Sequence, residues 1–183
     1  MSKKIIFITG VTSGVGRETA RRFIKEGWKV IGTGRRQSRL DELAAELGGD
    51  FLPLCFDVAK RDVVVEMFAN LPEGFKDIDV LLNNAGSSIG QNPAQSGNMD
   101  DWDEMIATNI KPGHLHTEFL AVRFKGDLKT SEAAYENLDP LTPENIAESV
   151  WWSVNLPAHM DVCDMELMPM CQSDGGWGFC HKS

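Results

Sequence analysis

Thr9-Gly10-Val11-Thr12-Ser13-Gly14-Val15-Gly16 is the stretch that decides the fold of this chain. It stands between a short, almost continuous apolar run at residues 3–9 and a segment, 15–26, whose apolar residues recur at helical spacing. A strand that is buried on both faces has such an apolar run. A glycine-rich turn between a strand and a helix lets backbone N–H groups approach a pyrophosphate, and the helix N-terminus adds favourable charge. We therefore expect a nucleotide to bind at Gly10, Thr12, Ser13, Gly14, Val15 and Gly16; the alternative is a tight turn without a ligand.

Strands and helices alternate strictly beyond this turn. The pattern predicts strands over 29–33, 51–56 and 78–82, with helices over 39–47 and 60–71 between them. Gly27 is expected to stop the first helix, and Ser38 to cap the second. Such alternation is typical of a parallel sheet connected by right-handed crossovers. It predicts an α/β fold with a Rossmann-like, doubly wound parallel sheet, shortened to the strand order 3-2-1-4 plus a C-terminal strand.

The second half of the chain has fewer clear signals. A helix is expected over 99–110, and another from Pro143, with Thr142 as its cap, to Asn155. A last strand is expected at 164–168, beside the fourth strand, which would otherwise leave an open hydrophobic edge. The length of 183 residues fits one domain, in which 1–111 form the cofactor-binding part and 112–183 a lid and C-terminal part.

Composition excludes several classes of partner. The net charge of −9 argues against a nucleic acid, because binding a phosphate backbone requires clustered Lys and Arg. No apolar run approaches the roughly 18 residues of a membrane span, and no signal peptide is evident, so a cytoplasmic location is expected. No Cys-x-x-Cys or His-x₃-His spacing occurs, so no metal site is expected. Reduced thiols are expected at Cys55, Cys163, Cys171 and Cys180.

The end of the second strand indicates which dinucleotide binds. Folds that bind NAD commonly place Asp or Glu there for the ribose 2′-OH, whereas Arg accommodates a 2′-phosphate. Here the sequence is Gly32-Thr33-Gly34-Arg35-Arg36, and no carboxylate follows until Asp41. Two adjacent guanidinium groups can make bidentate, charge-assisted bonds to phosphate. We therefore expect NADP(H) rather than NAD(H); the alternative is a solvated basic loop.

Three motifs together carry a resemblance to a known family. The spacing Thr-Gly-x-x-x-Gly-x-Gly resembles the first signature of the short-chain dehydrogenase/reductase family, Asn83-Asn84-Ala85-Gly86 resembles its second, and Asp57-Val58 resembles its adenine-contacting pair. Later segments, 112–127, 141–144 and 156–159, resemble the narrower branch of NADP-dependent 3-hydroxy acid dehydrogenases, which also act on serine and allo-threonine. The resemblance covers nearly the whole chain.

The resemblance implies roles for individual residues. Arg35 and Arg36 would hold the 2′-phosphate, Asp57 and Val58 would flank the adenine, and Asn84, in the signature that ends at Gly86, would lie near the adjoining ribose. Asn109 would position a proton-relay water through its backbone. Thr117 would touch the cofactor, and residues 119–127 would form a substrate lid. The implied partners are a nicotinamide dinucleotide and, if the protein is active, a small hydroxy acid.

One departure from the family is large. The family carries a catalytic Ser and a Tyr-x-x-x-Lys between the helix that holds the Asn and the Pro-Gly turn, but here Lys111 runs directly into Pro112. The missing stretch corresponds to about 60 residues, or two βαβ units. The only tyrosine, Tyr135, is followed four positions later by Asp139, not by Lys.

Other proton donors have weaker support. His114 and His116 are candidates, although two exposed loop histidines is the plainer interpretation, because no carboxylate is spaced to orient either. Three hypotheses stay open: an enzyme that has lost its catalytic segment, a non-catalytic nucleotide-binding or interaction protein, and an active enzyme with a rewired site.

The adjacent pair Trp151-Trp152 is a candidate for both core and surface roles. Helical spacing places Trp151 on one face with Ile146, Val150 and Val154. A pair of this kind usually packs one ring in the core and the other at a subunit contact. The pair therefore makes a homo-oligomer a candidate assembly.

Overall fold

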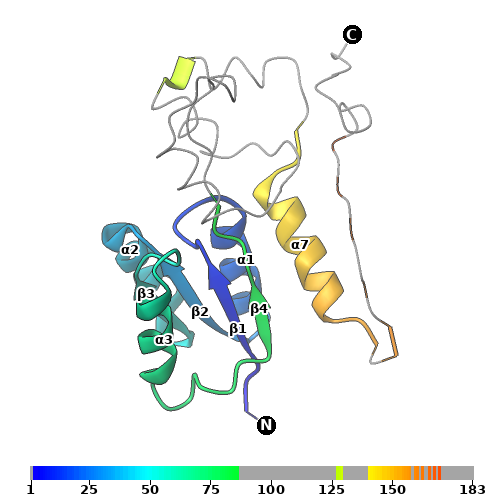
Figure 1. Cartoon of the computed structure of the whole chain (residues 1–183). Coiled ribbons are helices and arrows are strands. Elements are labelled where there is room, and N and C mark those ends of the chain that lie inside the picture. The colour runs from blue at the N-terminus through cyan, green and yellow to red at the C-terminus, as the bar shows by residue number, and fades with distance from the viewer. Residues whose placement is uncertain are drawn as a thin grey trace.

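Four parallel strands form the sheet in the described part of the chain, in the order β3-β2-β1-β4 (Figure 1). The computed structural model describes residues 2–86, 127–129, 140–157, 159–160, 162, 165, 167 and 169. The strands are β1 (Ile5–Thr9), β2 (Lys29–Gly34), β3 (Phe51–Cys55) and β4 (Val80–Leu82). The predicted order 3-2-1-4 is confirmed.

Helices cover both faces of this sheet. They are α1 (Gly14–Lys25), α2 (Gln37–Leu47), α3 (Arg61–Ala69) and α7 (Pro143–Val154), with a 3₁₀ turn, η1 (Gly48–Asp50), before β3. Successive side chains of a strand point to opposite faces. Ile6 and Ile8 of β1 therefore pack with α1, α2 and α7, whereas Ile5 and Phe7 pack with α3. Burial on both faces explains why β1 is apolar throughout, and the doubly wound arrangement is confirmed.

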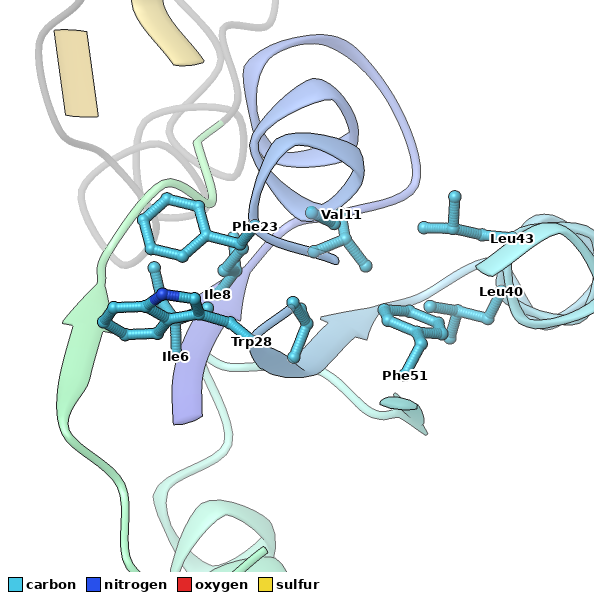
Figure 2. Close-up of a cluster of buried hydrophobic side chains, with 10 residues drawn as sticks. Ile6, Ile8, Val11, Phe23, Trp28, Leu40, Leu43 and Phe51 are labelled. Atoms are coloured by element: carbon cyan, nitrogen blue, oxygen red, sulfur yellow. The ribbon is translucent and has the colours of Figure 1, made fainter. Parts of the chain in front are cut away.

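Helix α1 ends in a glycine motif that begins an aromatic cluster. Gly27 has a φ of 81° and donates its N–H to the carbonyl of Ile24 at 2.9 Å, while Trp28 donates to the carbonyl of Phe23 at 3.0 Å. This is the Schellman pattern, which commonly brings the two flanking apolar side chains together. The rings of Phe23 and Trp28 meet edge-on with centroids 5.0 Å apart, over Ile6 and Ile8 (Figure 2). The predicted stop at Gly27 is confirmed.

Helix α7 attaches the C-terminal part of the chain to this cluster. Thr142 and Asn145 form a capping box at its start, so the predicted cap is confirmed. The Trp151 ring lies edge-on to Phe23 at 5.0 Å, and the guanidinium of Arg22 lies 5.0 Å from the centre of the same ring. These contacts place α7 beside α1 (Figure 1).

The two neighbouring tryptophans have different environments. Trp151 also meets Trp28, with ring centroids 6.0 Å apart, whereas the side chain of Trp152 is 54% exposed. One ring therefore packs against the core, as helical spacing predicts. A subunit contact at Trp152 stays a prediction.

Several predicted boundaries are wrong. Ser38 is not a helix cap: α2 begins at Gln37, because the carbonyl of Arg36 already accepts a hydrogen bond from the N–H of Leu40. Strand β4 begins at Val80, not at residue 78, because the carboxylate of Asp79 accepts from the N–H of Ile5 at 2.7 Å.

Two predicted elements lie outside the described residues. They are the helix over 99–110 and most of the strand over 164–168; within the latter, Met165 and Leu167 are described and belong to no strand. None of the helices that the structure describes is long and apolar enough to cross a membrane.

We predict that Trp151→Ala lowers the free energy of unfolding by about 2–4 kcal/mol, because it removes a large aromatic side chain from the contact between α1 and α7. The matched control is Trp152→Ala, which removes the same side chain from an exposed position and should change stability by about 0.5 kcal/mol or less. Urea unfolding of both variants measures the difference. Equal losses would contradict the assignment of Trp151 to the core.

Candidate functional site

The candidate site lies where β1 and β2 end and α1 begins (Figure 1). Gly10 and Gly14 have φ values of 74° and 56°, in the left-handed region that favours glycine. The carbonyl of Thr33 in β2 accepts hydrogen bonds from the N–H groups of Gly10, at 3.0 Å, and Val11, at 2.9 Å. These bonds hold the start of the loop against the end of the neighbouring strand.

Gly16 allows α1 to pack directly against this loop. A Cβ atom at Gly16 would lie 2.4 Å from the carbonyl oxygen of Gly10 and 2.5 Å from Nδ2 of Asn84. A Cβ atom at Gly10 would lie 2.9 Å from Cα of Ala85. Both glycines are therefore required by close approach, which explains the spacing of the glycine motif.

Asn84 and Thr9 join the carboxyl ends of β4 and β1. The amide Nδ2 of Asn84 donates to the carbonyls of Thr9, at 2.8 Å, and Gly10, at 3.0 Å. In return, Oγ1 of Thr9 accepts from the N–H groups of Asn84 and Ala85, each at 2.9 Å. We call this set of four hydrogen bonds the Thr9–Asn84 clasp. It brings the two sequence signatures together, and Gly86 follows two residues later.

Arg36 reaches from the end of β2 across to the glycine loop. Its Nη2 donates to Oγ1 of Thr12 at 2.8 Å and to Oγ of Ser13 at 3.1 Å, and its Nε donates to Oγ1 of Thr12 at 3.3 Å. Arg35, the residue before it, is exposed at the same strand end. Arg36 is therefore placed beside the loop, and Arg35 precedes it at the same strand end.

Arg39 is a residue that the sequence analysis missed. It lies in the first turn of α2, and its Nη1 donates to the carbonyl of Thr12 at 3.4 Å. The sequence position of Arg39 could have indicated this role, because a residue three positions after Arg36 lies on the same side of a helix.

Asp57 and Val58 lie just beyond β3, the strand next to β2. The N–H of Phe56 donates to the carbonyl of Gly34 at 3.1 Å, and Oδ1 of Asp57 accepts from the N–H of Ala59 at 3.0 Å. Val58 packs against the cluster that contains Phe56. The predicted adenine pair is thus at the same edge of the sheet as the loop, where open α/β sheets bind their ligands.

The N-terminus of α1 is suited to an anion. Its first turn contains no acidic residue, and no side chain among those described makes a capping hydrogen bond there. The hydroxyl of Ser13, at the cap position, instead accepts from Arg36. The helix dipole and the first N–H groups therefore favour a phosphate, as in dinucleotide-binding loops. The residues present fit such a cofactor.

The remaining candidate residues lie outside the described part of the chain. These are Asn109, His114, His116, Thr117 and Tyr135, with most of the predicted lid. Within the described ranges, no three His, Cys, Asp or Glu side chains gather as a metal ion would require.

A glycine turn at the switch between strand and helix, on a parallel sheet of order 3-2-1-4, defines a nucleotide-binding α/β protein. The family model described as short chain dehydrogenase matches residues 4–127. The chain belongs to this family.

Curated relatives and solved structures agree with the family. Serine 3-dehydrogenase of Agrobacterium fabrum (strain C58 / ATCC 33970) is 35% identical over 245 aligned positions, which span 97% of this chain and 98% of the relative. NADP-dependent 3-hydroxy acid dehydrogenase YdfG of Escherichia coli (strain K12) is 35% identical over 241 positions, spanning 94% and 97%. The closed form of a serine dehydrogenase complexed with NADP⁺ is 34% identical, with a TM-score of 0.90, and the alignment covers 97% of this chain and all of that one.

We predict that Asn84→Ala lowers the free energy of unfolding by about 1–3 kcal/mol, because it leaves the carbonyls of Thr9 and Gly10 without these donors. The matched control is Asn70→Ala, which removes an exposed amide that donates to the carbonyl of Glu66 at the end of α3. Chemical denaturation compares the two. If the control is as damaging as Asn84→Ala, the clasp has no special role.

Proposed function

We propose that this protein binds NADP(H) at the glycine loop and does not carry out the hydride transfer of its family at an ordinary rate. The observation that supports the cofactor is the position of Arg36, which lies over the hydroxyls of Thr12 and Ser13 at the end of a β2 strand that lacks a carboxylate. The relatives at about 35% identity are named as serine and NADP-dependent 3-hydroxy acid dehydrogenases. The proposed family reaction is hydride transfer between NADP and a 3-hydroxy acid or serine-like alcohol.

Each residue of the proposed cofactor site has a place in this scheme. Gly10, Gly14 and Gly16 allow the backbone N–H groups at the start of α1 to meet the pyrophosphate. Arg35 and Arg36 supply positive charge for the 2′-phosphate. Asp57 and Val58 flank the adenine, and Asn84 lies beside its ribose. The cofactor, when bound, supplies or accepts the hydride; the chain must supply the proton.

Chain length supports the loss of the proton donor. Because 97% of 183 residues is about 178, about 67 of the 245 positions aligned with the Agrobacterium relative hold no residue of this chain. A loss of this size matches the catalytic segment proposed to be missing between Lys111 and Pro112. Reduction of a carbonyl requires a proton donor within hydrogen-bond reach and support for the developing oxyanion.

The alternative function is a non-catalytic nucleotide-binding or interaction protein derived from this fold.

We predict that NADPH binds more tightly than NADH and that Arg35→Ala/Arg36→Ala removes most of this preference. A hydrogen bond to a charged group is worth about 1.5–3 kcal/mol, so the ratio of the two dissociation constants should fall by about 10- to 100-fold. Titration of nicotinamide fluorescence measures it. Arg61→Ala, which removes an exposed guanidinium at the start of α3, is the control and should leave the ratio unchanged. Equal affinities in the wild type would reject the NADP assignment.

We predict that the purified 183-residue protein turns over 3-hydroxy acids or serine at least about 10²–10⁴-fold more slowly than family members, because it lacks the proton donor. Nicotinamide absorbance measures the rate. A family-like segment inserted between Lys111 and Pro112 should restore turnover, and the same insert with its Tyr changed to Phe is the control.

The outcomes separate the three hypotheses. Ordinary turnover by the wild type would contradict the proposal and point to His114, His116 or Tyr135 as the donor, which single substitutions would identify. A grafted protein that folds and binds NADPH but stays inactive would support the non-catalytic alternative.

A further inference from the structure

Thr12 contacts two residues at the end of β2, Gly34 and Arg36, which are both distant from it in the sequence. Its side chain is buried, and its Oγ1 accepts from Nη2 and Nε of Arg36 at 2.8 and 3.3 Å. Its methyl group faces the backbone of Gly34, the last residue of β2. One side chain therefore contacts the strand end in two ways: its hydroxyl accepts hydrogen bonds from Arg36, and its methyl group packs against Gly34.

Gly34 is a glycine because of this methyl group. A Cβ atom at Gly34 would lie 2.4 Å from Cγ2 of Thr12, whereas the next nearest atoms, Cβ and Oγ1 of Thr12, are at 3.6 Å. The φ of Gly34 is not in the left-handed region, so its backbone conformation is open to other residues. A single methyl group accounts for the whole overlap.

Thr12 cannot turn its methyl group away without a loss. Threonine has few χ1 rotamers, and rotation about χ1 moves Oγ1 together with Cγ2. The Oγ1 atom is the acceptor for Arg36. A side chain at position 34 and the hydrogen bond between Arg36 and Thr12 therefore compete with each other.

Position 34 matters because NAD-binding folds commonly place the carboxylate that accepts from the ribose 2′-OH at this strand end. Specificity can be gained by excluding one ligand as well as by attracting another. We propose that Thr12 and Gly34 form a coupled pair that sets the cofactor preference, in which the Thr12 hydroxyl orients Arg36 for the 2′-phosphate and the Thr12 methyl group excludes a carboxylate side chain from position 34. This proposal rests on the proposed binding of NADP(H).

The steric contact between Thr12 and position 34 is tested without any nucleotide. Gly34→Ala should lower the melting temperature by roughly 2–10 °C, and the shift should become much smaller in a Thr12→Ser background, because serine keeps the hydroxyl and lacks the methyl group. Gly49→Ala is the control, since a Cβ atom at Gly49 meets nothing within 4 Å. If the shifts caused by Gly34→Ala and Thr12→Ser simply add in the double variant, the steric coupling is wrong.

The effect of the pair on the preference between NADPH and NADH is tested by titrating both cofactors into matched variants. Thr12→Val keeps a methyl group and loses the hydroxyl, so it should lower the ratio of NADPH affinity to NADH affinity about tenfold, whereas Thr12→Ser, which keeps the hydroxyl, should lower this ratio much less. Gly34→Asp should gain NADH affinity only together with Thr12→Ser.

Each result has a defined consequence. If Gly34→Asp alone binds NADH as tightly as the Gly34→Asp/Thr12→Ser variant, the methyl group does not exclude the carboxylate and the proposal is overturned. If the wild type binds neither cofactor, the proposed function fails and the specificity claim with it, while the melting temperatures still decide whether Thr12 and Gly34 are coupled.

Discussion

The Thr9–Asn84 clasp, the set of four hydrogen bonds defined above, is the constraint on which the rest of the site depends. They hold the carboxyl ends of β1 and β4 together from both directions: the Asn84 amide donates to the end of β1, and the Thr9 hydroxyl accepts from the backbone after β4. Because the Asn84 amide lies over Gly10, α1 can begin there only if Gly16 has no side chain. The direction of α1, and so of its positive N-terminus, follows from this contact.

The second half of the site is built on β2. The Thr33 carbonyl fixes the start of the loop, and Arg36 and Arg39 donate to its middle at Thr12. Positive charge and the glycine loop are thus joined by hydrogen bonds within the chain itself. Preorganisation of this kind reduces the ordering that binding requires. It also means that a change at Thr12 acts on both the loop and the basic residues.

The sequence predicted features that depend on local pattern and missed those that depend on distant contacts. Strand order followed from alternation, and helical spacing separated Trp151 from Trp152, because the neighbours of a helix face are three and four residues apart. The cap assigned to Ser38 was wrong because α2 starts two residues earlier than predicted, at Gln37, with a bond to the Arg36 carbonyl that has no side-chain signature. The contact between Thr12 and Gly34 joins the glycine loop after β1 to the end of β2, so no local pattern could reveal it. For Asn109 and Thr117, only the family resemblance applies.

The glycines and the basic residues carry different weight as evidence for a nucleotide. Gly10 and Gly16 are required by contacts with Ala85, Asn84 and the loop itself, so a protein that had lost its ligand would still need them in order to fold. The same holds for Asn84, whose bonds join two strands. Arg35 and Arg36 are exposed residues at the end of a strand, and Arg36 donates hydrogen bonds to Thr12 and Ser13 of the loop. Neither side chain belongs to the buried core, and a bound 2′-phosphate gives two adjacent positive charges a physical reason that core packing does not. For this chain, the charge at the end of β2 argues for retained cofactor binding more strongly than the glycine motif does.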